Sequence, residues 1–352
     1  MDDRIGIRVP AVDAEARRRA RERADALLMP PRALGRLLEL GEQAAGIAGF
    51  PTPDLSRKAI VVMAGDHGVT AEGVSAYPSE VTGQMVHGFC AGMAGINVLS
   101  RHSGITVRVV DMGCAADLSA LVASGAVVDC KVAPGTRNLR REPAMTPEQA
   151  VTAIRRGAEV ARALAAEGVR MLGTGDMGIG NTTPSAAIAV VATGRSAREL
   201  TGRGTGVDDA GLSRKTRVIE ESVAERAPDP RDGVDVLSRV GGFEIGGIAG
   251  LVLGAAECRL PVVIDGVIST AGAVIAWLLE PRVRDYLFAA HRSVEPAHQA
   301  MLELLDLDPI LDLQMRLGEG TGCALAMPII EAGVKVIREM ATFAEAGVSG
   351  AS

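Results

Sequence analysis

The feature that most constrains the fold of this chain is an alternation of short apolar runs with longer stretches of helical periodicity. The runs are rich in β-branched residues, and they span 59–63, 107–110, 126–132, 169–172, 262–264 and 286–289. They lack the polar alternation of a strand with one wet face, so we expect strands that are covered on both faces. Helical stretches are expected at 78–101, 147–167, 184–192, 208–225, 244–257, 269–279 and 322–343. The sequence therefore predicts an α/β fold with a doubly wound, mostly parallel sheet of about six strands.

The two chain ends depart from this pattern, because they contain helical sequence but no strand. Residues 14–28 place opposite charges four positions apart, which is typical of a solvated helix. The arginines of this stretch could also form a nucleic-acid-binding arm, but the interleaved acids neutralise most of their charge. A second short helix is expected at 33–48. We predict a smaller helical domain built from residues 1–55 and 300–352, beside a large α/β domain at 56–299.

Composition excludes several classes of protein. The formal net charge is −6, and the chain has only 5 Phe, 2 Tyr and 1 Trp. A nucleic-acid-binding protein needs a basic footprint and often aromatic stacking platforms, so we expect no nucleic-acid partner. The five cysteines are far apart and form no CxxC pair, which predicts reduced thiols rather than disulfides or a zinc site. The charged first residues and the lack of an apolar run of roughly 20 residues predict a cytoplasmic protein without a membrane segment.

A glycine-rich segment, GTGDMGIGNTTP at 173–184, follows the fourth expected strand. Gly173, Gly175 and Gly178 satisfy the GxGxxG fingerprint of dinucleotide-binding folds, so an NAD-linked oxidoreductase is one alternative. That fingerprint also requires a second strand that ends in an acid about 20 residues later, and the sequence has helical character there. The fingerprint alone is weak evidence for a dinucleotide.

The same segment fits a monophosphate site better. The candidate contacts are Gly178, Ile179, Gly180, Asn181 and Thr182. Glycines let backbone N–H groups turn toward an anion, and the helix that follows aims its positive end at the same place. We expect Thr183 to cap this helix and Pro184 to occupy its first position. A tight strand-to-helix turn without a ligand is the alternative interpretation.

Two charged residues belong to the same prediction. Asp176 falls within the loop, where a negative charge would repel phosphate, so it should face a ribose hydroxyl or a developing cation. Lys215, in a helical stretch, could supply a counter-charge to phosphate, although a lone lysine there could also be simply solvated.

A second glycine-rich segment, Leu317-Gly318-Glu319-Gly320-Thr321-Gly322, precedes the last helical stretch. A carboxylate between glycines gains little from packing, and glycines let backbone and ligand approach closely. Partial burial under a bound ring would raise its pKa and make it a usable general base. An exposed turn acid is the alternative.

Polar residues also follow other expected strands. Asp66 and His67 end the first strand and could begin a metal site, but no matching second cluster appears, so we expect no metal and assign them hydrogen bonds to neighbouring loops. Ser75 and Gln84 lie just downstream, and Asp265 ends another strand where it could meet a ribose hydroxyl. The chain has no GxSxG elbow and no GxxxxGK[ST] loop, which disfavours serine hydrolases and P-loop NTPases.

Several of these motifs, in this order, resemble the nicotinate-nucleotide:5,6-dimethylbenzimidazole phosphoribosyltransferase (CobT) family of cobalamin synthesis. The resemblance covers nearly the whole chain. The matching segments are MPPRALGRL at 29–37, MAGDHGV at 63–69, GVSAYPSEVTGQMV at 73–86, GDMGIGNTTP at 175–184, VVIDGVIS at 262–269 and MRLGEGTG at 315–322.

The resemblance implies transfer of phosphoribose from nicotinate mononucleotide to a benzimidazole, giving α-ribazole 5′-phosphate and nicotinate, with no cofactor. It also implies a homodimer, a Rossmann-like parallel sheet and a small helical domain. Glu319 falls on the family's general base, and Asp176 stands where the family commonly has glutamate. The substrate contacts it implies fall on the 178–182 loop, Lys215, Asp265 and Ser293, and we add Ser75, Gln84, Leu317 and Gly318 to the expected substrate site.

Three points stay open at the level of sequence. Because the carboxylate of Asp176 is shorter than that of the family's glutamate, its role and the preferred base are undecided. Whether a partner subunit contributes to the pocket is also undecided. The alternatives are the NAD-linked oxidoreductase and a non-catalytic nucleotide-binding regulatory protein that keeps the fold without turnover.

Overall fold

The computed structural model describes residues 4–349, and its centre is a single seven-stranded sheet in which every strand pairing is parallel. The strands are β1 Lys58–Gly65, β2 Thr106–Gly113, β3 Val127–Asp129, β4 Met171–Met177, β5 Val262–Ile264, β6 Leu287–His291 and β7 Pro309–Leu311. Their order across the sheet is β3-β2-β1-β4-β5-β6-β7. The order reverses beside β1, so the loops after β1 and β4 leave a crevice of the kind in which α/β sheets bind ligands.

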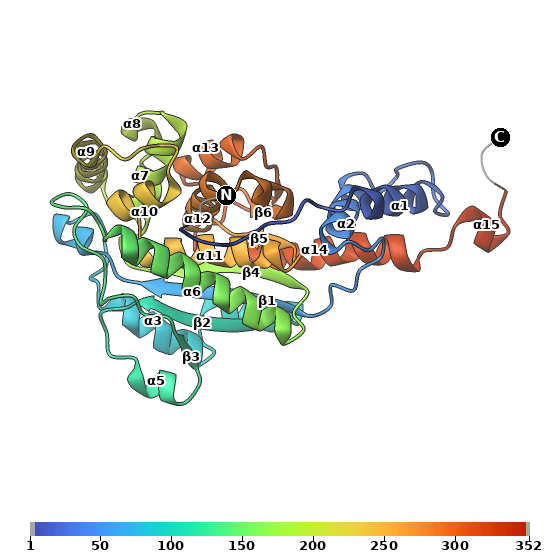
Figure 1. The fold of residues 1–352 in the computed structure, drawn as a ribbon, viewed down its shortest axis with the longest axis horizontal. Coiled ribbons are helices and arrows are strands. Elements are labelled where there is room, and N and C mark those ends of the chain that lie inside the picture. The colour runs from blue at the N-terminus through green and yellow to red at the C-terminus, as the bar shows by residue number, and fades with distance from the viewer. Residues whose placement is uncertain (1–3, 350–352) are drawn as a thin grey trace.

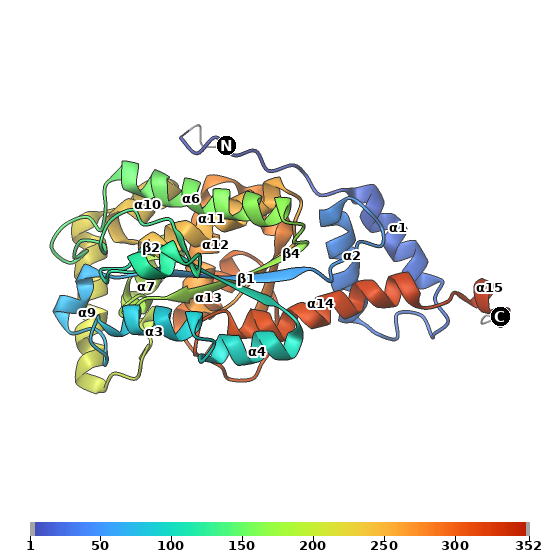
Figure 2. The same cartoon turned by 90° about the horizontal axis from the view of Figure 1, so that it is seen from below.

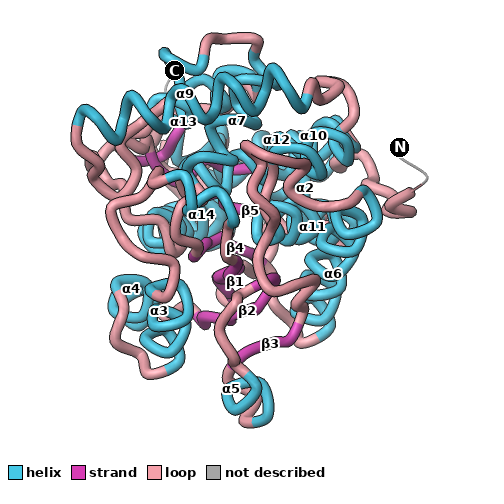
Figure 3. Tube along the Cα trace, turned by 90° about the vertical axis from the view of Figure 1, so that its left-hand side faces the viewer, coloured by secondary structure: helices cyan, strands magenta, loops and turns pink. Residues whose placement is uncertain are grey.

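Helices cover both faces of the sheet, which confirms the doubly wound prediction. The longer helices are α1 Ala14–Asp25, α2 Arg36–Ala48, α3 Val81–Cys90, α4 Gly95–Ser103, α6 Pro147–Ala166, α7 Thr182–Thr193, α9 Asp209–Arg226, α10 Gly233–Val240, α11 Phe243–Glu257, α12 Val267–Leu279, α13 Pro296–Leu304 and α14 Thr321–Glu339. The short ones are α5 Ser119–Ala123, α8 Ala197–Leu200 and α15 Phe343–Ala346, with 3₁₀ turns η1 Gly68–Glu72 and η2 Pro281–Tyr286. Viewed along the strands, α6 and α11 lie on one side of the sheet and α3, α4 and α14 on the other (Figure 3). The central strands β1 and β5 are therefore buried from both sides, as their apolar sequence requires.

The helices at the two chain ends lie together, away from the sheet, whereas residues 4–10 extend along the α/β part of the molecule, where the Arg4 side chain donates to Asp232 and the Tyr286 hydroxyl donates to the Pro10 oxygen. Helices α1 and α2 pack beside the far half of α14, and α15 follows at the end of the described chain (Figures 1 and 2). The Arg23 side chain donates to the backbone oxygen of Ile337, which ties α1 to α14. Whether residues 1–55 and 300–352 form a domain of their own stays a prediction, and β7, within the second segment, belongs to the sheet.

The expected strands are confirmed, with two differences. The fourth was expected at 169–172, but β4 runs to Met177, so Asp176 lies in the strand and not in the loop after it. Gly173 and Gly175 weaken the apolar signal, and both are required by close packing. A Cβ atom on Gly175 would lie 2.5 Å from the backbone oxygen of Glu319. The seventh strand was missed because it is short and half-buried, and it begins with proline.

The helix expected at 78–101 is two helices, α3 and α4. Gly92 adopts a φ of 74° in the turn between them, a conformation that ends a helix. Within residues 4–349, no helix is both long and apolar enough to cross a bilayer.

Candidate active site

A cavity of about 320 Å³ opens where the carboxyl ends of the central strands meet the loops that follow them. We call it the strand-end pocket. Six residues that the sequence predicts for the site line it: Asp176, Asn181, Thr182, Ser293, Leu317 and Gly318. They come from β4, the start of α7, the segment after β6 and the segment before α14, so the sheet brings together parts of the chain that are far apart in sequence.

Asp176 is a buried carboxylate at the end of β4. Its Oδ2 accepts a hydrogen bond from Asn181 Nδ2 at 2.9 Å, and its Oδ1 has no protein partner. Burial raises its pKa well above the ordinary aspartate value, and the nearby charge of Asp265 adds to the effect. A Cβ atom on Gly318 would lie 3.2 Å from Asp176 Oδ1, so Asp176 sits directly beneath the glycine-rich segment before α14.

The 178–182 loop joins β4 to α7. The Ile179 amide donates to Thr82 Oγ1 at 3.0 Å, and the Asn181 amide donates to the Gly178 oxygen at 3.1 Å. These two amides are therefore used within the protein. Helix α7 begins at Thr182, whose amide has no partner within the helix.

The expected cap of α7 was wrong. Asn181 is the N-cap residue, and Thr183 lies inside the first turn with its hydroxyl buried and without a partner. Pro184 is the third residue of the helix, where its missing N–H also costs no hydrogen bond. The helix starts earlier because the Gly180 turn, with a φ of 88°, already directs the chain into it.

Lys215 projects from α9 to the start of α7. Its Nζ donates to Thr182 Oγ1 at 2.7 Å and to the Gly202 oxygen at 3.1 Å, and the side chain is almost fully buried. Burial lowers its pKa to about 8, against which the charge of Glu295 acts. A buried ammonium group beside a helix start is a favourable place for an anion.

Glu319 occupies a strained backbone. Its φ is 63°, between Gly318 at 80° and Gly320 at 91°, so three successive residues adopt the left-handed conformation. Such a conformation costs a non-glycine residue free energy, and it is often found at functional sites. The Glu319 Oε2 accepts from the Ile96 amide at 3.0 Å, near the start of α4, and burial raises the pKa of this carboxyl.

Asp265 fixes this strained segment in place. Its Oδ1 accepts from the Gly322 amide at 2.7 Å, and its Oδ2 accepts from the Gly320 amide at 3.0 Å. The side chain is fully buried, with His291 Nε2 3.6 Å from Oδ1. In this structure Asp265 therefore binds the first amides of α14, and its contact with a ribose hydroxyl stays a prediction.

The remaining predicted residues are more scattered. Ser75 is not among the pocket-lining residues, but its Oγ is 3.2 Å from Oγ1 of Thr205, which lines the pocket. Gln84 is exposed on α3 and is not among the pocket-lining residues. Ser293 is buried, and its amide donates to His298 Nδ1 at 3.0 Å.

Sequence reasoning missed a buried pair under the site. His67 Nε2 lies 2.9 Å from Glu244 Oε1, and both side chains are fully buried. Burial alone would lower the pKa of His67, but the charge and hydrogen bond of Glu244 raise it. The His67 ring packs against Gly178, where a Cβ atom would lie 3.2 Å from Nε2. Glu244 was assigned to a helical stretch, and no local signal connects residues 177 positions apart.

Other polar residues of the pocket also went unassigned. Tyr77, Thr205, His291, Glu295 and Arg316 line it. The segment HRSVEPAH at 291–298 directly follows β6, and its density of polar residues after a buried strand is the signal that could have identified His291 and Glu295. Among residues 4–349, no group of three or more His, Cys, Asp or Glu side chains is arranged to hold a metal ion.

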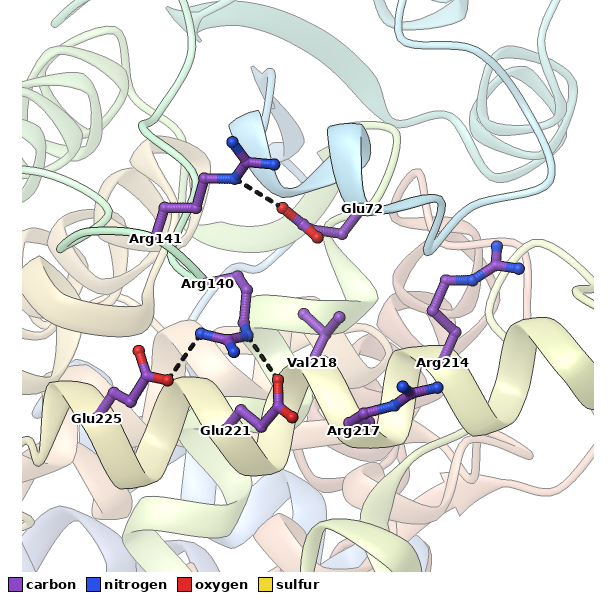
Figure 4. A pocket seen from close by; sticks show the side chains of 8 residues that line it. All are labelled: Glu72, Arg140, Arg141, Arg214, Arg217, Val218, Glu221 and Glu225. Carbon is purple, nitrogen blue, oxygen red and sulfur yellow. Dashed lines mark hydrogen bonds and ion pairs between the residues drawn. The ribbon is translucent and has the colours of Figure 1, made fainter.

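A larger hollow, of about 590 Å³, lies beside α9 and shares no lining residue with the strand-end pocket (Figure 4). It contains four arginines, but Arg140 pairs with Glu221 and Glu225, and Arg141 pairs with Glu72. Since most of its charge is neutralised by these acids, we do not assign it a ligand.

Comparison with known proteins gives consistent results. The family model described as Phosphoribosyltransferase matches residues 9–348. A protein of Geotalea uraniireducens named nicotinate-nucleotide--dimethylbenzimidazole phosphoribosyltransferase is 55% identical over 342 residues, which are 97% of this chain and 96% of that protein. A protein of the same name from Geobacter sulfurreducens is 56% identical over 338 residues, 96% and 95% of the two chains. A crystal structure of CobT from Thermus thermophilus superposes with a TM-score of 0.91 at 46% identity, covering 96% of this chain and all of that one.

Proposed function

The chain belongs to the phosphoribosyltransferase family that these proteins represent, and from this premise we propose the following reaction and division of labour at the strand-end pocket. The enzyme transfers the phosphoribosyl group of nicotinate mononucleotide to 5,6-dimethylbenzimidazole. The products are α-ribazole 5′-phosphate and nicotinate, and the step belongs to lower-ligand assembly in cobalamin biosynthesis.

The observation that supports the assignment of roles is which groups lie in the strand-end pocket and which lie behind it. Asp176, Thr182 and Ser293 line the cavity. Lys215 and Glu319 are not among the lining residues, but Lys215 Nζ donates to Thr182 Oγ1, and the backbone of Glu319 packs against Gly175 of β4. We assign the phosphate of the nucleotide to Thr182 and Lys215, and the ribose and the two rings to Asp176 and Glu319.

The chemistry requires little more than this arrangement. Nicotinate bound through its ring nitrogen is a cationic leaving group, so the bond from nitrogen to the anomeric carbon breaks without a strong acid. The unprotonated nitrogen of the benzimidazole attacks that carbon from the opposite face, which converts the β linkage into an α linkage. Holding both rings in line supplies acceleration by orientation.

The proton balance assigns a role to Glu319. As the benzimidazole nitrogen forms its new bond, positive charge spreads through the ring and the other N–H becomes acidic. Glu319 accepts that proton, and its raised pKa brings it closer to the working pH, where a general base is most effective. Asp176, beneath Gly318, is proposed to face the ribose and the charge that develops at the anomeric carbon.

The literal GxGxxG fingerprint does not favour an oxidoreductase. Gly173 and Gly175 lie within β4, where they make room for α14 and for the backbone of Glu319, and not in a turn that could approach a pyrophosphate. The regulatory alternative is tested by the same experiment as the enzyme.

That experiment is incubation of the protein with nicotinate mononucleotide and 5,6-dimethylbenzimidazole, followed by chromatography. We expect equal amounts of nicotinate and α-ribazole 5′-phosphate. Nucleotide binding without product would favour a non-catalytic protein, and a panel of purines, phenols and substituted benzimidazoles would establish the preferred base.

We further propose that the enzyme is a homodimer. Met93, Val98 and Leu317 are large apolar side chains that stay exposed near Glu319, with exposed fractions of 74%, 53% and 60%. Adjacent exposed apolar side chains are typical of interaction surfaces. Sedimentation at micromolar concentration should give twice the chain mass, and a monomer would contradict this proposal.

A further inference from the structure

Glu295 is a buried acid that the reaction proposed above does not use. It is the N-cap residue of α13, but its side chain makes no capping hydrogen bond to that helix. It turns instead toward the 202–204 turn, where its Oε1 accepts from the Gly204 amide at 3.0 Å. The Gly202 position has no space for a Cβ atom, because the carboxylate of Glu295 already lies there. Glu295 therefore packs tightly against this turn.

Lys215 contacts the same turn. Its Nζ donates to the Gly202 oxygen at 3.1 Å and to Thr182 Oγ1 at 2.7 Å. A Cβ atom on Gly204, whose φ is 52°, would lie 3.1 Å from that Nζ. The turn therefore contacts two buried charged side chains, the carboxylate of Glu295 and the ammonium group of Lys215.

We propose that Glu295 is a positioning residue, which holds the 202–204 turn against Lys215 and so fixes where the ammonium group meets the phosphate of the substrate. The inference rests on the proposed role of Lys215 in phosphate binding. Glu295 itself does not approach the phosphate as a ligand, because its Oε1 is directed at the turn and a second negative charge would repel the anion.

The charges around Lys215 explain why a carboxylate is needed here. Glu295 is the acid that acts on Lys215, and Arg316 faces the same turn through its donation to the Gly204 oxygen at 3.2 Å. Arg203 is directed away, toward the Val207 oxygen. The nearby His298 is neutral, because burial lowers its pKa to about 3.

Without the charge of Glu295, burial would act on Lys215 unopposed. Its pKa would fall below the value of about 8 that it has with the carboxylate in place. The lysine would then lose its proton within the working range of pH, and its attraction for the phosphate dianion would be lost at lower pH than in the wild type.

The test is the pH profile of kcat/KM for nicotinate mononucleotide in Glu295→Gln. The glutamine keeps an oxygen that can accept from the Gly204 amide but removes the charge. We expect the basic limb to move to lower pH by about one unit, with kcat at saturation little changed at pH 7. The profile for nicotinate riboside, which has no phosphate, should not move. Glu303→Gln, at an exposed position of the same helix, is the control and should match the wild type.

A second variant separates the effect of the charge at position 295 from the effect of side-chain length. Glu295→Asp keeps the charge but cannot span the distance to the turn, so the KM for nicotinate mononucleotide should rise several-fold, with the riboside unaffected. If Glu295→Gln does not fold, this variant decides, and an unchanged KM overturns the proposal. An unmoved basic limb in folded Glu295→Gln also overturns it.

The result for Lys215→Ala distinguishes this proposal from the one on which it rests. If that variant loses nucleotide and riboside equally, the phosphate assignment fails and the role of Glu295 fails with it. If it loses the nucleotide selectively while Glu295→Gln leaves the profile unchanged, only the role of Glu295 is wrong.

Discussion

Two glycine-rich segments lead into helices at the strand-end pocket, and they differ in how the first amides of each helix are used. At α7, the helix begins at Thr182, and the ammonium of Lys215 donates to the side chain of that residue. At α14, the carboxylate of Asp265 already accepts from the amides of Gly320 and Gly322. The positive end of α7 is open to an anion, whereas that of α14 is occupied by a carboxylate of the protein.

A glycine-rich segment does not by itself specify whether the helix that follows it can bind an anion. Both segments are rich in glycine and lead into a helix, but Asp265, which follows β5, satisfies the helix amides of the second segment and holds the backbone of Glu319 in place. With its helix amides satisfied, that segment can hold three successive residues in the left-handed conformation and present an acceptor to the substrate. One segment is thus suited to phosphate and the other to a proton.

The largest effect should come from removing the acceptor of the second segment. Glu319→Gln keeps the size of the side chain but cannot take a proton, so we expect kcat to fall about 10²- to 10⁴-fold. Nucleotide binding, measured by calorimetry, should be nearly unchanged. Glu339→Gln, an exposed position at the end of the same helix, serves as the control. A near-normal rate in Glu319→Gln would remove Glu319 from its role.

The next effect tests the donor side. Lys215→Ala removes a charge-assisted contact worth about 1.5–3 kcal/mol, so the KM for nicotinate mononucleotide should rise by roughly 10- to 100-fold. Nicotinate riboside should be affected far less. Arg217→Ala, on the same helix but directed into the hollow of Figure 4, should leave both substrates unchanged. Equal losses for the two substrates would mean that Lys215 does not meet the phosphate.

The third variant changes Asp265, the residue that makes the two segments different. Asp265→Asn leaves one acceptor oxygen for two buried amides, and an unsatisfied buried amide costs about 1–3 kcal/mol. We expect lower unfolding free energy in urea together with slower turnover, since the Glu319 segment loses its frame. Asp208→Asn, at the N-cap of α9, is the control, because aspartate and asparagine cap helices about equally well. Unchanged stability and rate would show that the segment holds its shape without Asp265.

The smallest effect should be a change in the pH dependence of stability. The pKa of Asp176 is raised in the folded state, so its contribution to stability is full below the unfolded pKa and is lost as pH rises through the folded pKa. Asp176→Asn removes this loss and keeps an oxygen in place of the carboxylate. The variant should therefore melt a few degrees above the wild type at pH 8, with the difference shrinking toward pH 4. A constant difference across that range would contradict the assigned titration.

The fold was largely predictable because most of its strands are marked by apolar runs in the local sequence. The apolar runs that became β1, β2 and β5 are long or pure enough to be recognised without tertiary information. The end of β4 was not, because Gly173 and Gly175 are chosen by packing against α14 and not by strand propensity. Likewise, β7 is a strand because it pairs with β6, and no pattern in the local sequence predicts that pairing.

The candidate site was predictable in its composition but not in its connections. Glycines around an acid at 318–320 indicated a carboxylate that a ligand could approach closely, but the left-handed conformation of Glu319 itself was not predicted. The partners of Asp265 lie 55 and 57 residues further along the chain, and its bonds to them follow from how β5 meets α14. The clamp of Glu295 on the 202–204 turn likewise joins residues 91 positions apart. Sequence periodicity carries no information on such distances.

The hydrogen bond from the Ile96 amide to Glu319 has a practical consequence. That amide belongs to α4, whose backbone takes no other part in the proposed chemistry, yet it touches the oxygen pair on which the hydrogen ion arrives. The amide nitrogen resonance of Ile96 should therefore shift when the Glu319 carboxyl gains or loses its proton. In isotope-labelled enzyme, this resonance would report the protonation state of Glu319. Titrating that single signal, with and without a bound heterocycle, would measure the basicity of the group directly rather than through reaction rates.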